Sequence, residues 1–369
     1  MMDKASNRPL IVFRTDASLE IGTGHVMRCL TLADALREGG ARTLFITREN
    51  RGHLVGQIVD GGHEVRVLPQ SSKLRTTASD IPAHAQWLGV EWGEDAQQTR
   101  QLLADERPAW LVVDHYAIER RWEQALRSTC ERLLVMDDLA DRPHDCDLLL
   151  DPTLGRTRGD YAEHLAADVR TLLGPKYALL RPQFAAYRNE SLARRKEPEL
   201  RHILIAMGGV DKDNATGRVL DAIQASDLPS QLKLTVVMGP QAPWLSSIQD
   251  RASRMRVSTD VRVGVTDMAR LMVHSDLAIG AAGGTSWERC CMGLPTLILS
   301  LAENQKKMTQ TLQDAGAAIA FNSITELVNH IEMLFTEREC LIDLAQLISA
   351  AAQVADGLGS QRVCSEMMG

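Results

Sequence analysis

A histidine that directly follows a glycine pair is the first residue of the chain with an evident chemical use. The run Gly22-Thr23-Gly24-His25 opens a segment whose apolar residues recur with helical spacing. The positive end of a helix dipole disfavours an imidazolium ion, so the ring of His25 would stay neutral and able to accept a proton from water. The run therefore predicts a general base at His25. A structural role, as a helix cap or a hydrogen bond to a loop, is the open alternative.

Charged residues on either side of this run are candidates for contacts with His25 or with a substrate. Arg14 and Asp16 end the preceding apolar run, and Arg28 lies three residues after His25 on the same side of the expected helix. Asp16 could orient the imidazole or bind substrate, with an Asx turn as its structural alternative. Arg28 could contact a phosphate or a carboxylate, or lie at the surface. Arg14 is assigned to substrate binding, together with Gly24, whose backbone a ligand can approach closely.

A second glycine-rich loop has the composition of a diphosphate-binding loop. Gly283-Gly284-Thr285-Ser286 follows a short apolar strand and opens another helix. Backbone amides of Gly284, Thr285 and Ser286 at a helix start attract anions, and the two hydroxyls can add donors. Glu288, about one turn further on, could accept hydrogen bonds from ribose hydroxyls. The alternative is a capping box between Glu288 and Thr285, and both roles are compatible.

Polar residues and glycines after other expected strands complete the candidate site. Tyr116 follows a strand that ends at Asp114; its hydroxyl could bond a sugar, and Asp114 could be structural. Gly208 and Gly209 form a backbone-lined turn, for which a tight turn with positive φ is the alternative. Asn304 follows a buried strand at the same level. Because ligands of parallel α/β sheets bind at the carboxyl ends of strands, both glycines and Asn304 are assigned to substrate binding.

Neither a metal nor an organic cofactor is expected. Asp137-Asp138 end a strand, but no set of His or carboxylate residues accompanies them at ligand spacing. His144 and Cys146 are too isolated to form a zinc site. Met27 occupies the third glycine position of the dinucleotide-binding fingerprint. Trp87 and Trp92 are expected to pack in a core rather than to form a platform for a sugar.

Short β-branched runs alternate with helical stretches along the chain, as in parallel α/β folds. The expected strands of the first half are Leu10–Arg14, Thr43–Thr47, Glu64–Leu68, Trp110–Asp114 and Leu133–Asp137. Those of the second half are His202–Ala206, Lys233–Met238, Val257–Val261, Leu277–Ile279 and Thr296–Leu299. The segment Val26–Gly39 is expected to be helical, and so is the whole tail after Ser323. Both glycine loops therefore connect a strand to a helix.

A polar stretch near the middle divides the chain. Residues 187–199 (YRNESLARRKEPE) are interpreted as an interdomain linker, with a solvated helix end as the alternative. Residues 1–186 would form an N-terminal Rossmann-like domain that carries the base. Residues 200–369 would form a C-terminal Rossmann-like domain with the diphosphate loop and a helical tail. The predicted fold class is α/β, with two doubly wound domains facing a cleft (GT-B-like). A fold alone does not determine a reaction.

Composition narrows the class of protein. A chain of 369 residues exceeds one ordinary core and suits two domains. Its net charge of −7 argues against a nucleic-acid partner, because phosphate backbones favour a basic face. No apolar run approaches the ~20 residues that cross a bilayer, and the first residues lack the features of a signal peptide. Seven Cys without a C-x-x-C pair fit reduced thiols. We therefore expect a cytoplasmic protein without a membrane partner, and a monomer is compatible with the sequence.

Several segments, in order along the chain, resemble the family of UDP-2,4-diacetamido-2,4,6-trideoxy-β-L-altropyranose hydrolases of the pseudaminic acid pathway. They are FRTDASLEIGTGHVMRCLTLADAL, VVDHY, MDDLADRPHDCDLLLDP, GPKYALLRPQF, MGGVDKDN and AIGAAGGTSWERCCMGLPTLILSLAENQ. The resemblance spans Leu10 to about Gln305; the tail beyond Ser323 carries no matching motif and could pack back on the first domain. It implies a GT-B-like fold, metal-independent hydrolysis, and release of UDP with inversion at the anomeric carbon.

The resemblance also implies roles for particular residues. His25 of the G-x-G-H motif would be the base, and the loop from Gly283 to Glu288 would be the UDP site of the C-terminal domain. Tyr116 would line the sugar pocket. His25, Asp16 and Tyr116 form the expected catalytic set, and a UDP-sugar is the expected small-molecule partner, with no cofactor.

Other functions remain open at this point. A glycosyltransferase of the MurG type has a similar glycine loop with a following Glu, and it would use His25 on an acceptor hydroxyl instead of water. A UDP-sugar 2-epimerase is a further option. A non-catalytic UDP-sugar sensor would bind the same ligand without turnover. Release of UDP in the absence of an acceptor separates hydrolysis from transfer and from sensing.

Overall fold

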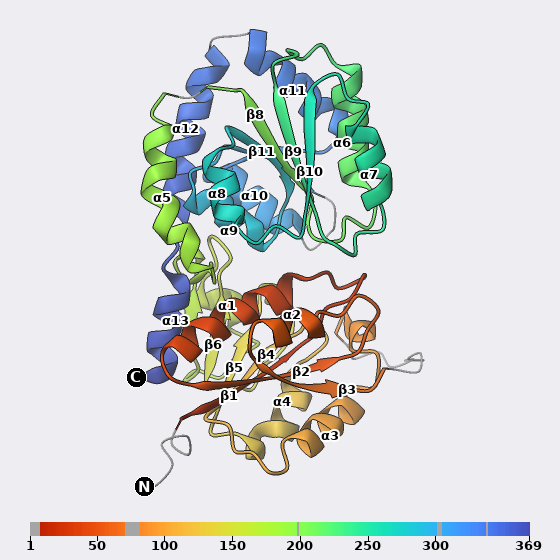
Figure 1. Ribbon diagram of the computed structural model, residues 1–369. Helices are drawn as coiled ribbons and strands as arrows, with labels where there is room; N and C mark the ends of the chain where they lie inside the picture. Colours follow the sequence, from red (N-terminus) through yellow and green to blue (C-terminus); the bar gives the residue numbers. More distant parts are fainter. Residues whose placement is uncertain (1–7, 71–81, 198, 301–304, 337–338) are drawn as a thin grey trace, which may run out of the picture. The chain divides into compact units, whose positions relative to one another are not determined.

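The computed structural model describes residues 8–70, 82–197, 199–300, 305–336 and 339–369 of the chain (Figure 1). The chain forms two compact units. The first unit comprises Met1–Leu179 and Gly359–Gly369, and the second unit comprises Leu180–Leu358. The division expected from the sequence lay between residues 186 and 200 and put the whole tail in the second domain. In the structure the last helix belongs to the first unit.

A parallel sheet runs through the first unit, with the strand order β3-β2-β1-β4-β5-β6-β7. Its strands are β1 (Leu10–Thr15), β2 (Arg42–Arg48), β3 (Glu64–Leu68), β4 (Trp110–Asp114), β5 (Arg132–Met136), β6 (Leu148–Asp151) and β7 (Arg170–Leu173). Its α-helices are α1 (Gly24–Glu38), α2 (Val55–Asp60), α3 (Trp92–Leu102), α4 (Arg120–Leu126) and α13 (Gly359–Met368). Short 3₁₀ turns are η2 (Ala85–Leu88), η3 (Arg127–Thr129), η4 (Arg158–Tyr161) and η5 (Pro175–Tyr177).

Alternate residues of the buried strands supply two cores on opposite faces of this sheet. Ile11 and Phe13 of β1 pack in the core that α1, α2 and α13 cover. Leu10 and Val12 pack in the core that α3 and α4 cover. Figure 1 shows α1 and α2 on one side of the strands and α3 and α4 on the other. Because successive side chains of a strand point to opposite faces, a strand covered on both sides is apolar throughout.

A second parallel sheet runs through the second unit, with the order β10-β9-β8-β11-β12-β13. Its strands are β8 (His202–Ala206), β9 (Lys233–Met238), β10 (Ser258–Val263), β11 (Leu277–Ala281), β12 (Thr296–Leu299) and β13 (Ile319–Phe321). Its helices are α5 (Pro182–Arg194), α6 (Ala215–Ala225), α7 (Leu245–Ala252), α8 (Met268–Val273), α9 (Gly284–Cys291), α10 (Lys306–Asp314), α11 (Ile324–Thr336) and α12 (Glu339–Val354).

The two doubly wound α/β units predicted from the sequence are confirmed. Every strand expected from the sequence is present, with ends that agree to within two residues. Three short strands, β6, β7 and β13, were not predicted, because runs of three or four apolar residues carry no clear periodicity. The stretch 187–199 is mostly helical, since α5 extends to Arg194. The helical alternative for this stretch therefore holds in place of the linker.

Both sheets reverse their winding direction next to their first strand. In the first unit the order runs from β1 to β2 and β3 on one side and to β4 on the other. In the second unit β8 has β9 and β10 on one side and β11 on the other. Connections at such a point leave in opposite directions, and doubly wound folds bind their ligands there, at the carboxyl ends of the strands. A ligand site is therefore expected at the loops after β1, β4, β8 and β11.

The last helix, α13, completes a core of the first unit. Val363 and Met367 are fully buried there, and the indole N–H of Trp110 donates a 2.9 Å hydrogen bond to the carbonyl oxygen of Met367. Met368, the next residue, is exposed. The C-terminal residues thus stabilise the unit in which the chain begins.

Replacing Met367 with Ala should destabilise the first unit by about 2–3 kcal/mol, because the change removes buried apolar volume and leaves a cavity. The free energy of unfolding can be followed from hydrogen exchange of the β1 amides. Met368→Ala is the matched control and should have little effect. Equal effects of the two substitutions would contradict a structural role for α13 in this core.

Candidate functional site

His25 is held by a carboxylate from a neighbouring strand. It is the second residue of α1 and is buried, with 7% of its surface exposed. Its Nδ1 atom lies 2.6 Å from Oδ1 of Asp114, the last residue of β4. Thr15 of β1 pairs with Asp114 in the sheet, so the strand register brings the carboxylate to the loop that carries the histidine. His25 therefore does not cap its helix but bonds across the switch point of the first sheet.

The contacts of Nδ1 decide which ring nitrogen carries the proton. Asp114 can only accept a hydrogen bond when it is ionised, so the 2.6 Å contact requires an N–H at Nδ1. The guanidinium of Arg28 also lies 3.3 Å from Nδ1, but its Nη2 already donates to Asp114 at 2.6 Å. The shorter contact with the carboxylate outweighs the longer one. In the neutral ring, Nε2 then carries the lone pair, and it has no hydrogen bond to any of the residues that the structure describes.

Arg28 fixes Asp114 from its other side. Its Nε donates to Oδ2 of Asp114 at 2.6 Å and its Nη2 to Oδ1 at 2.6 Å, a bidentate pairing. Its Nη1 donates to Oδ2 of Asp138 at 2.9 Å. Burial alone would raise the pKa of Asp114, but the charges of Arg28 and His25 outweigh burial and hold that pKa well below its ordinary value. Asp114 is therefore ionised throughout the physiological range.

Tyr116 contacts both His25 and Asp138. Its hydroxyl donates to Oδ1 of Asp138 at 2.5 Å, and its ring meets the imidazole of His25 edge to face, with centroids 4.5 Å apart. Burial, followed by the charge of Asp138, raises the pKa of Tyr116 well above its ordinary value. The phenol is therefore neutral and serves as a hydrogen-bond donor. Two carboxylates, Asp114 and Asp138, thus connect His25, Arg28 and Tyr116.

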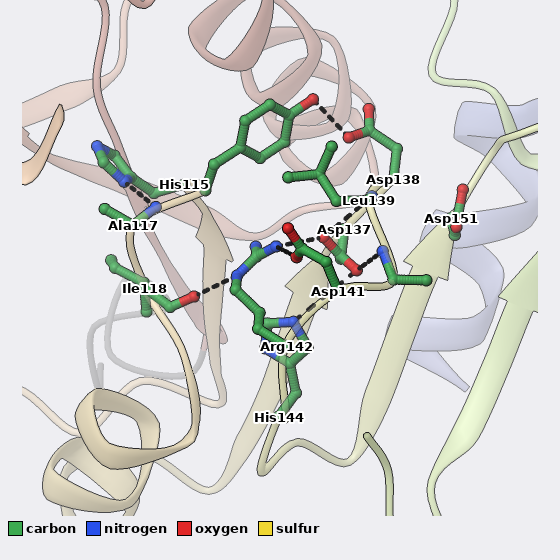
Figure 2. A network of polar contacts seen from close by, with 12 residues as sticks. His115, Ala117, Ile118, Asp137, Asp138, Leu139, Asp141, Arg142, His144 and Asp151 are labelled. Atoms are coloured by element: carbon green, nitrogen blue, oxygen red, sulfur yellow. Dashed lines mark hydrogen bonds and ion pairs between the residues drawn. The ribbon is translucent and has the colours of Figure 1, made fainter. Parts of the chain in front are cut away.

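The loop after β5 positions Asp138 by means of its buried neighbour Asp137 (Figure 2). Asp137 accepts hydrogen bonds from the backbone N–H of Ala140 at 2.9 Å and from Nη1 of Arg142 at 2.8 Å. The carbonyl oxygen of Asp138 accepts a hydrogen bond from Arg156 at 2.7 Å. These bonds hold both sides of the peptide at Asp138. The segment that resembled the hydrolase family at MDDLADRPHDCDLLLDP is, in large part, this support.

Asp16 does not contact His25. Its Oδ1 accepts hydrogen bonds from Nη1 of Arg14 and from the backbone N–H of Arg48, both at 2.7 Å. Arg14 also donates to both oxygens of the buried Asp95. Burial would raise the pKa of Asp16, but Arg14 and His115 outweigh it and hold that pKa well below its ordinary value. Arg14 and Asp16 are both 0% exposed, so they form a support beneath the loop. The prediction that Asp16 orients the imidazole is wrong, because Asp114 is the carboxylate that contacts His25.

In the second unit, the predicted glycine loop follows β11 as expected. Gly283 precedes α9, and Gly284, Thr285 and Ser286 form its first turn, with Gly284 exposed. The hydroxyl of Ser286 accepts a hydrogen bond from the backbone N–H of Gly283 at 3.3 Å. Ser286 therefore closes the cap of this helix. Gly284 and the partly exposed Thr285 are the members of the turn that a ligand can approach.

A buried arginine holds this loop from below. Arg289 is 2% exposed and donates to the carbonyl oxygen of Ala281 at 2.9 Å, to Ser286 Oγ at 3.0 Å and to Thr285 Oγ1 at 3.2 Å. A Cβ atom on residue 280 would lie 2.6 Å from Nη1 of Arg289, so only a glycine at this position leaves space for the guanidinium. Burial lowers the pKa of Arg289 to about 10, and the side chain is still charged at neutral pH. The loop therefore has a fixed positive charge behind it.

Glu288 lies one turn into α9 and does not serve as the helix cap. Its side chain is 16% exposed, and its Oε1 lies 3.9 Å from Nη2 of Arg181. Burial raises the pKa of Glu288, with Arg181 and Arg289 opposing the shift. The capping function that the sequence allowed for Glu288 belongs to Ser286. A partly buried carboxylate next to the glycine loop is free to accept hydrogen bonds from a ligand.

The Gly208-Gly209 turn follows β8, on the other side of the switch point in the second sheet. Both glycines are exposed, and Gly208 has a φ of +98°, a conformation that other residues rarely adopt. Asp211, at the end of the turn, accepts hydrogen bonds from the backbone N–H groups of Ala215 and Thr216, the first two residues of α6. The tight-turn role is therefore present, and the exposed amides leave room for a ligand contact. Asn304 lies outside the described residues.

The described part of the chain contains neither a metal-binding cluster nor a membrane-spanning helix. No group of three or more His, Cys, Asp or Glu side chains there is arranged to hold a metal ion. No helix in the same residues has the length and apolar character needed to cross a membrane.

Sequence reasoning missed the residues that hold His25 in place. Asp114 was considered structural, and Asp138 was not assigned to the site; for Arg28, the predicted contact with a carboxylate is present. One signal was available: Asp114 is the last residue of β4, Asp138 is the second residue after the neighbouring parallel strand β5, and Arg28 is about one helical turn after His25. Carboxylates at the carboxyl ends of adjacent strands lie at the same edge of the sheet, next to the helix that starts there.

Comparisons with known proteins define the fold. No family model matches the chain. Among solved structures it is similar to Acinetobacter baumannii MurG, with a TM-score of 0.64, 16% identity and 98% and 99% of the two chains covered. It is also similar to the spinosyn rhamnosyltransferase SpnG bound to thymidine diphosphate (TM-score 0.58, 17% identity, 97% and 99% covered) and to Staphylococcus aureus MnaA bound to UDP (0.59, 14%, 96% and 94%). The chain has the GT-B fold of these proteins.

Curated relatives are distant. The chain is 25% identical to an uncharacterized protein of Methanocaldococcus jannaschii, over 80% of this chain and 57% of that protein. It is 32% identical to the Bacillus subtilis spore coat polysaccharide biosynthesis protein SpsG, over 42% and 45%. It is 24% identical to the Campylobacter jejuni UDP-2,4-diacetamido-2,4,6-trideoxy-β-L-altropyranose hydrolase, over 84% and 98%. The chain thus spans about half the length of the first two relatives and nearly all of the third, to which it is distantly related.

Replacing Asp114 with Asn should destabilise the first unit by about 3 kcal/mol at neutral pH, because Arg28 would lose its buried partner. The folded-state pKa of Asp114 is lowered, so its stabilising effect is present above the ordinary carboxyl range. That effect is lost as the pH falls through the lower folded-state value. The difference between wild type and variant should therefore shrink below about pH 4. Hydrogen exchange of the β1 and β4 amides across pH measures it.

Asp60→Asn, at the exposed end of α2, provides the control and should leave exchange unchanged. A loss of stability in Asp114→Asn that did not depend on pH would show that ionisation of this carboxyl is not what stabilises the unit.

Proposed function

We propose that this chain is a UDP-sugar hydrolase in which His25 deprotonates the attacking water. The observation that carries the proposal is the 2.6 Å contact between His25 Nδ1 and the buried Asp114 carboxylate. A carboxylate on Nδ1 orients an imidazole, leaves Nε2 as the proton acceptor and stabilises the imidazolium that forms on proton transfer. The second carboxylate of the network, Asp138, keeps Arg28 and Tyr116 in place, so the ring has one orientation.

The chemical step requires only proton transfer and displacement. A water molecule gives a proton to Nε2 of His25 while its oxygen attacks the anomeric carbon of the sugar. The bond from that carbon to the diphosphate oxygen breaks, and UDP leaves with the bonding electron pair. Attack opposite to the leaving group inverts the anomeric centre. A base of this kind contributes a factor of roughly 10²–10⁴ in rate.

The glycine loop of the second unit supports the departure of UDP. Amides at the start of α9 and the positive charge of Arg289 behind them favour the charge that develops on the diphosphate. Glu288 is assigned to the ribose hydroxyls, and the exposed Gly208-Gly209 amides to further contacts with the nucleotide-sugar. With this loop as the source of stabilisation, the reaction is proposed to need no metal ion.

The relatives support this choice of substrate and reaction. The Campylobacter jejuni protein is named as a hydrolase of a UDP-linked diacetamido sugar and is similar over 84% of this chain. The segments that resembled its family contain His25, Asp114, Tyr116 and Glu288. We therefore assign a UDP-linked 2,4-diacetamido-2,4,6-trideoxy sugar as the substrate, within pseudaminic acid biosynthesis. A cytoplasmic location belongs to the same proposal.

Glycosyl transfer is the second candidate, because SpnG, which has the same fold, is named as a rhamnosyltransferase. A transferase would use the same His25–Asp114 pair on a sugar or aglycone hydroxyl. Incubation of the purified chain with the UDP-sugar alone separates the two functions. Hydrolysis yields equal amounts of UDP and free sugar, whereas transfer requires an added acceptor. A sensor protein would bind the UDP-sugar and release no UDP.

Replacing His25 with Gln should reduce release of UDP from the diacetamido UDP-sugar by roughly 10²–10⁴-fold, because the water loses its proton acceptor. The affinity for UDP should remain, since the glycine loop lies in the other unit. Turnover is measured by coupled detection of UDP, and affinity by calorimetry. The partly exposed His53 gives a control, His53→Gln, with unchanged turnover. Turnover of His25→Gln within a few-fold of wild type would remove this histidine from the mechanism.

Replacing Glu288 with Gln should weaken UDP binding by roughly tenfold at neutral pH, because a charged acceptor of the ribose hydroxyls becomes neutral. Burial raises the pKa of Glu288, so acidification should protonate it and bring the wild-type affinity toward that of the variant. Calorimetric titration with UDP across pH measures both effects. Glu326→Gln, an exposed change in the same unit, is the control. A dissociation constant unaffected in Glu288→Gln would exclude this contact.

A further inference from the structure

Three aromatic rings lie against one another beside the candidate base. This ring cluster consists of His84, Trp87 and Tyr116. The centroids of His84 and Trp87 are 4.4 Å apart, those of His84 and Tyr116 are 5.4 Å apart, and those of Trp87 and Tyr116 are 5.7 Å apart. Tyr116 also meets the ring of His25 at 4.5 Å. The cluster therefore adjoins the imidazole that the proposed mechanism uses.

The ring cluster is not part of a hydrophobic core. Each of the three side chains is partly exposed, and none of them belongs to the buried clusters on either face of the first sheet. Leu88, the residue after Trp87, is buried in one of those clusters. The expectation of core packing holds for Trp92, which packs against one of those clusters, and is wrong for Trp87. The turn η2 places Leu88 inside and leaves the indole at the surface next to Tyr116.

Trp87 and His84 of the ring cluster have polar ring atoms without a hydrogen-bond partner among the described residues. The indole N–H of Trp87 and both ring nitrogens of His84 have no hydrogen bond to any residue within the described ranges. Burial, together with the charges of Arg142 and His25, outweighs Asp141 and lowers the pKa of His84, so this ring is neutral at physiological pH. The hydroxyl of Tyr116 is committed to Asp138. The cluster thus presents apolar ring faces and free neutral donors, and the carboxylate in contact with it, Asp138, is already paired with Arg28 and Tyr116.

We infer that the ring cluster binds an N-acyl substituent of the sugar, on the carbon next to the anomeric centre. An acetamido group has a methyl for the ring faces, a carbonyl oxygen for the indole N–H and an N–H for a neutral imidazole nitrogen. A hydroxyl would leave the apolar faces unfilled, and an ammonium group would call for an unpaired carboxylate, whereas Asp138 is already neutralised by Arg28. His25 acts at the anomeric carbon and touches Tyr116, which places the cluster near the adjacent substituent. The inference rests on the proposed function.

UDP-N-acetylglucosamine and UDP-glucose form a matched pair of probes, because they differ only at this substituent. Calorimetry on the full chain should show that the wild type binds the acetamido sugar roughly tenfold more tightly, the range for a group that fills a hydrophobic pocket. Trp87→Leu should bring this preference close to one while leaving the affinity for UDP unchanged. Trp87→Phe keeps a ring but lacks the N–H, and it should retain part of the preference.

Trp244→Leu makes the same change at an exposed tryptophan of the second unit and should keep the full preference. A Trp87→Leu protein with the wild-type preference, or a wild type without any preference, would overturn the inference. Should Trp87→Leu fail to fold, Trp87→Phe decides, because loss of the N–H alone must lower the preference several-fold. Failure of the proposed hydrolysis is distinguishable from failure of this inference. A wild type that prefers UDP-N-acetylglucosamine over UDP-glucose but releases no UDP from the diacetamido UDP-sugar would support the subsite and contradict the hydrolysis.

Discussion

The buried carboxylate of Asp114 is the constraint on which the candidate site depends. Asp114 is 0% exposed and is ionised only because His25 and Arg28 both bond to it. An unpaired charge in such a place would cost several kcal/mol, so the arrangement of α1 against β4 is tied to these contacts. The register of β1 with β4 puts the carboxylate at the edge of the sheet where α1 begins. Orientation of the histidine and stability of the first unit therefore have the same physical origin.

A related device holds the glycine loop of the second unit. Arg289 is buried, and within the described residues its hydrogen bonds go to a carbonyl oxygen and two hydroxyls of the loop rather than to a carboxylate. A glycine-rich segment has high conformational entropy, and the fixed guanidinium restricts it to one shape. In the first unit a buried anion orients a base, and in the second a buried cation shapes a loop that suits an anion. Asp114 and the loop that Arg289 holds each lie beside the switch point of their own sheet.

The fold was predictable because strand and helix periodicity and the glycine turns between them are local properties of the sequence. His25 and the glycine loop before α9 were found for the same reason. The partner of His25 was not found from the sequence, because Asp114 lies 89 residues further along the chain. Only the order of the strands in the sheet brings Asp114 next to His25. Asp16, which is close in sequence, was the natural choice, but it bonds to Arg14 and Arg48. Short strands such as β13 escaped prediction because three residues define no period.

The most direct test of the account is the protonation of the two ring nitrogens of His25, read from their ¹⁵N chemical shifts in the full chain labelled at histidine. With the ring neutral, we predict a proton on Nδ1, held by Asp114, and an unprotonated Nε2. In Asp114→Asn this preference should weaken. A neutral ring with its proton on Nε2 in the wild type would contradict the account, because the nitrogen assigned to accept the proton from water would already be occupied.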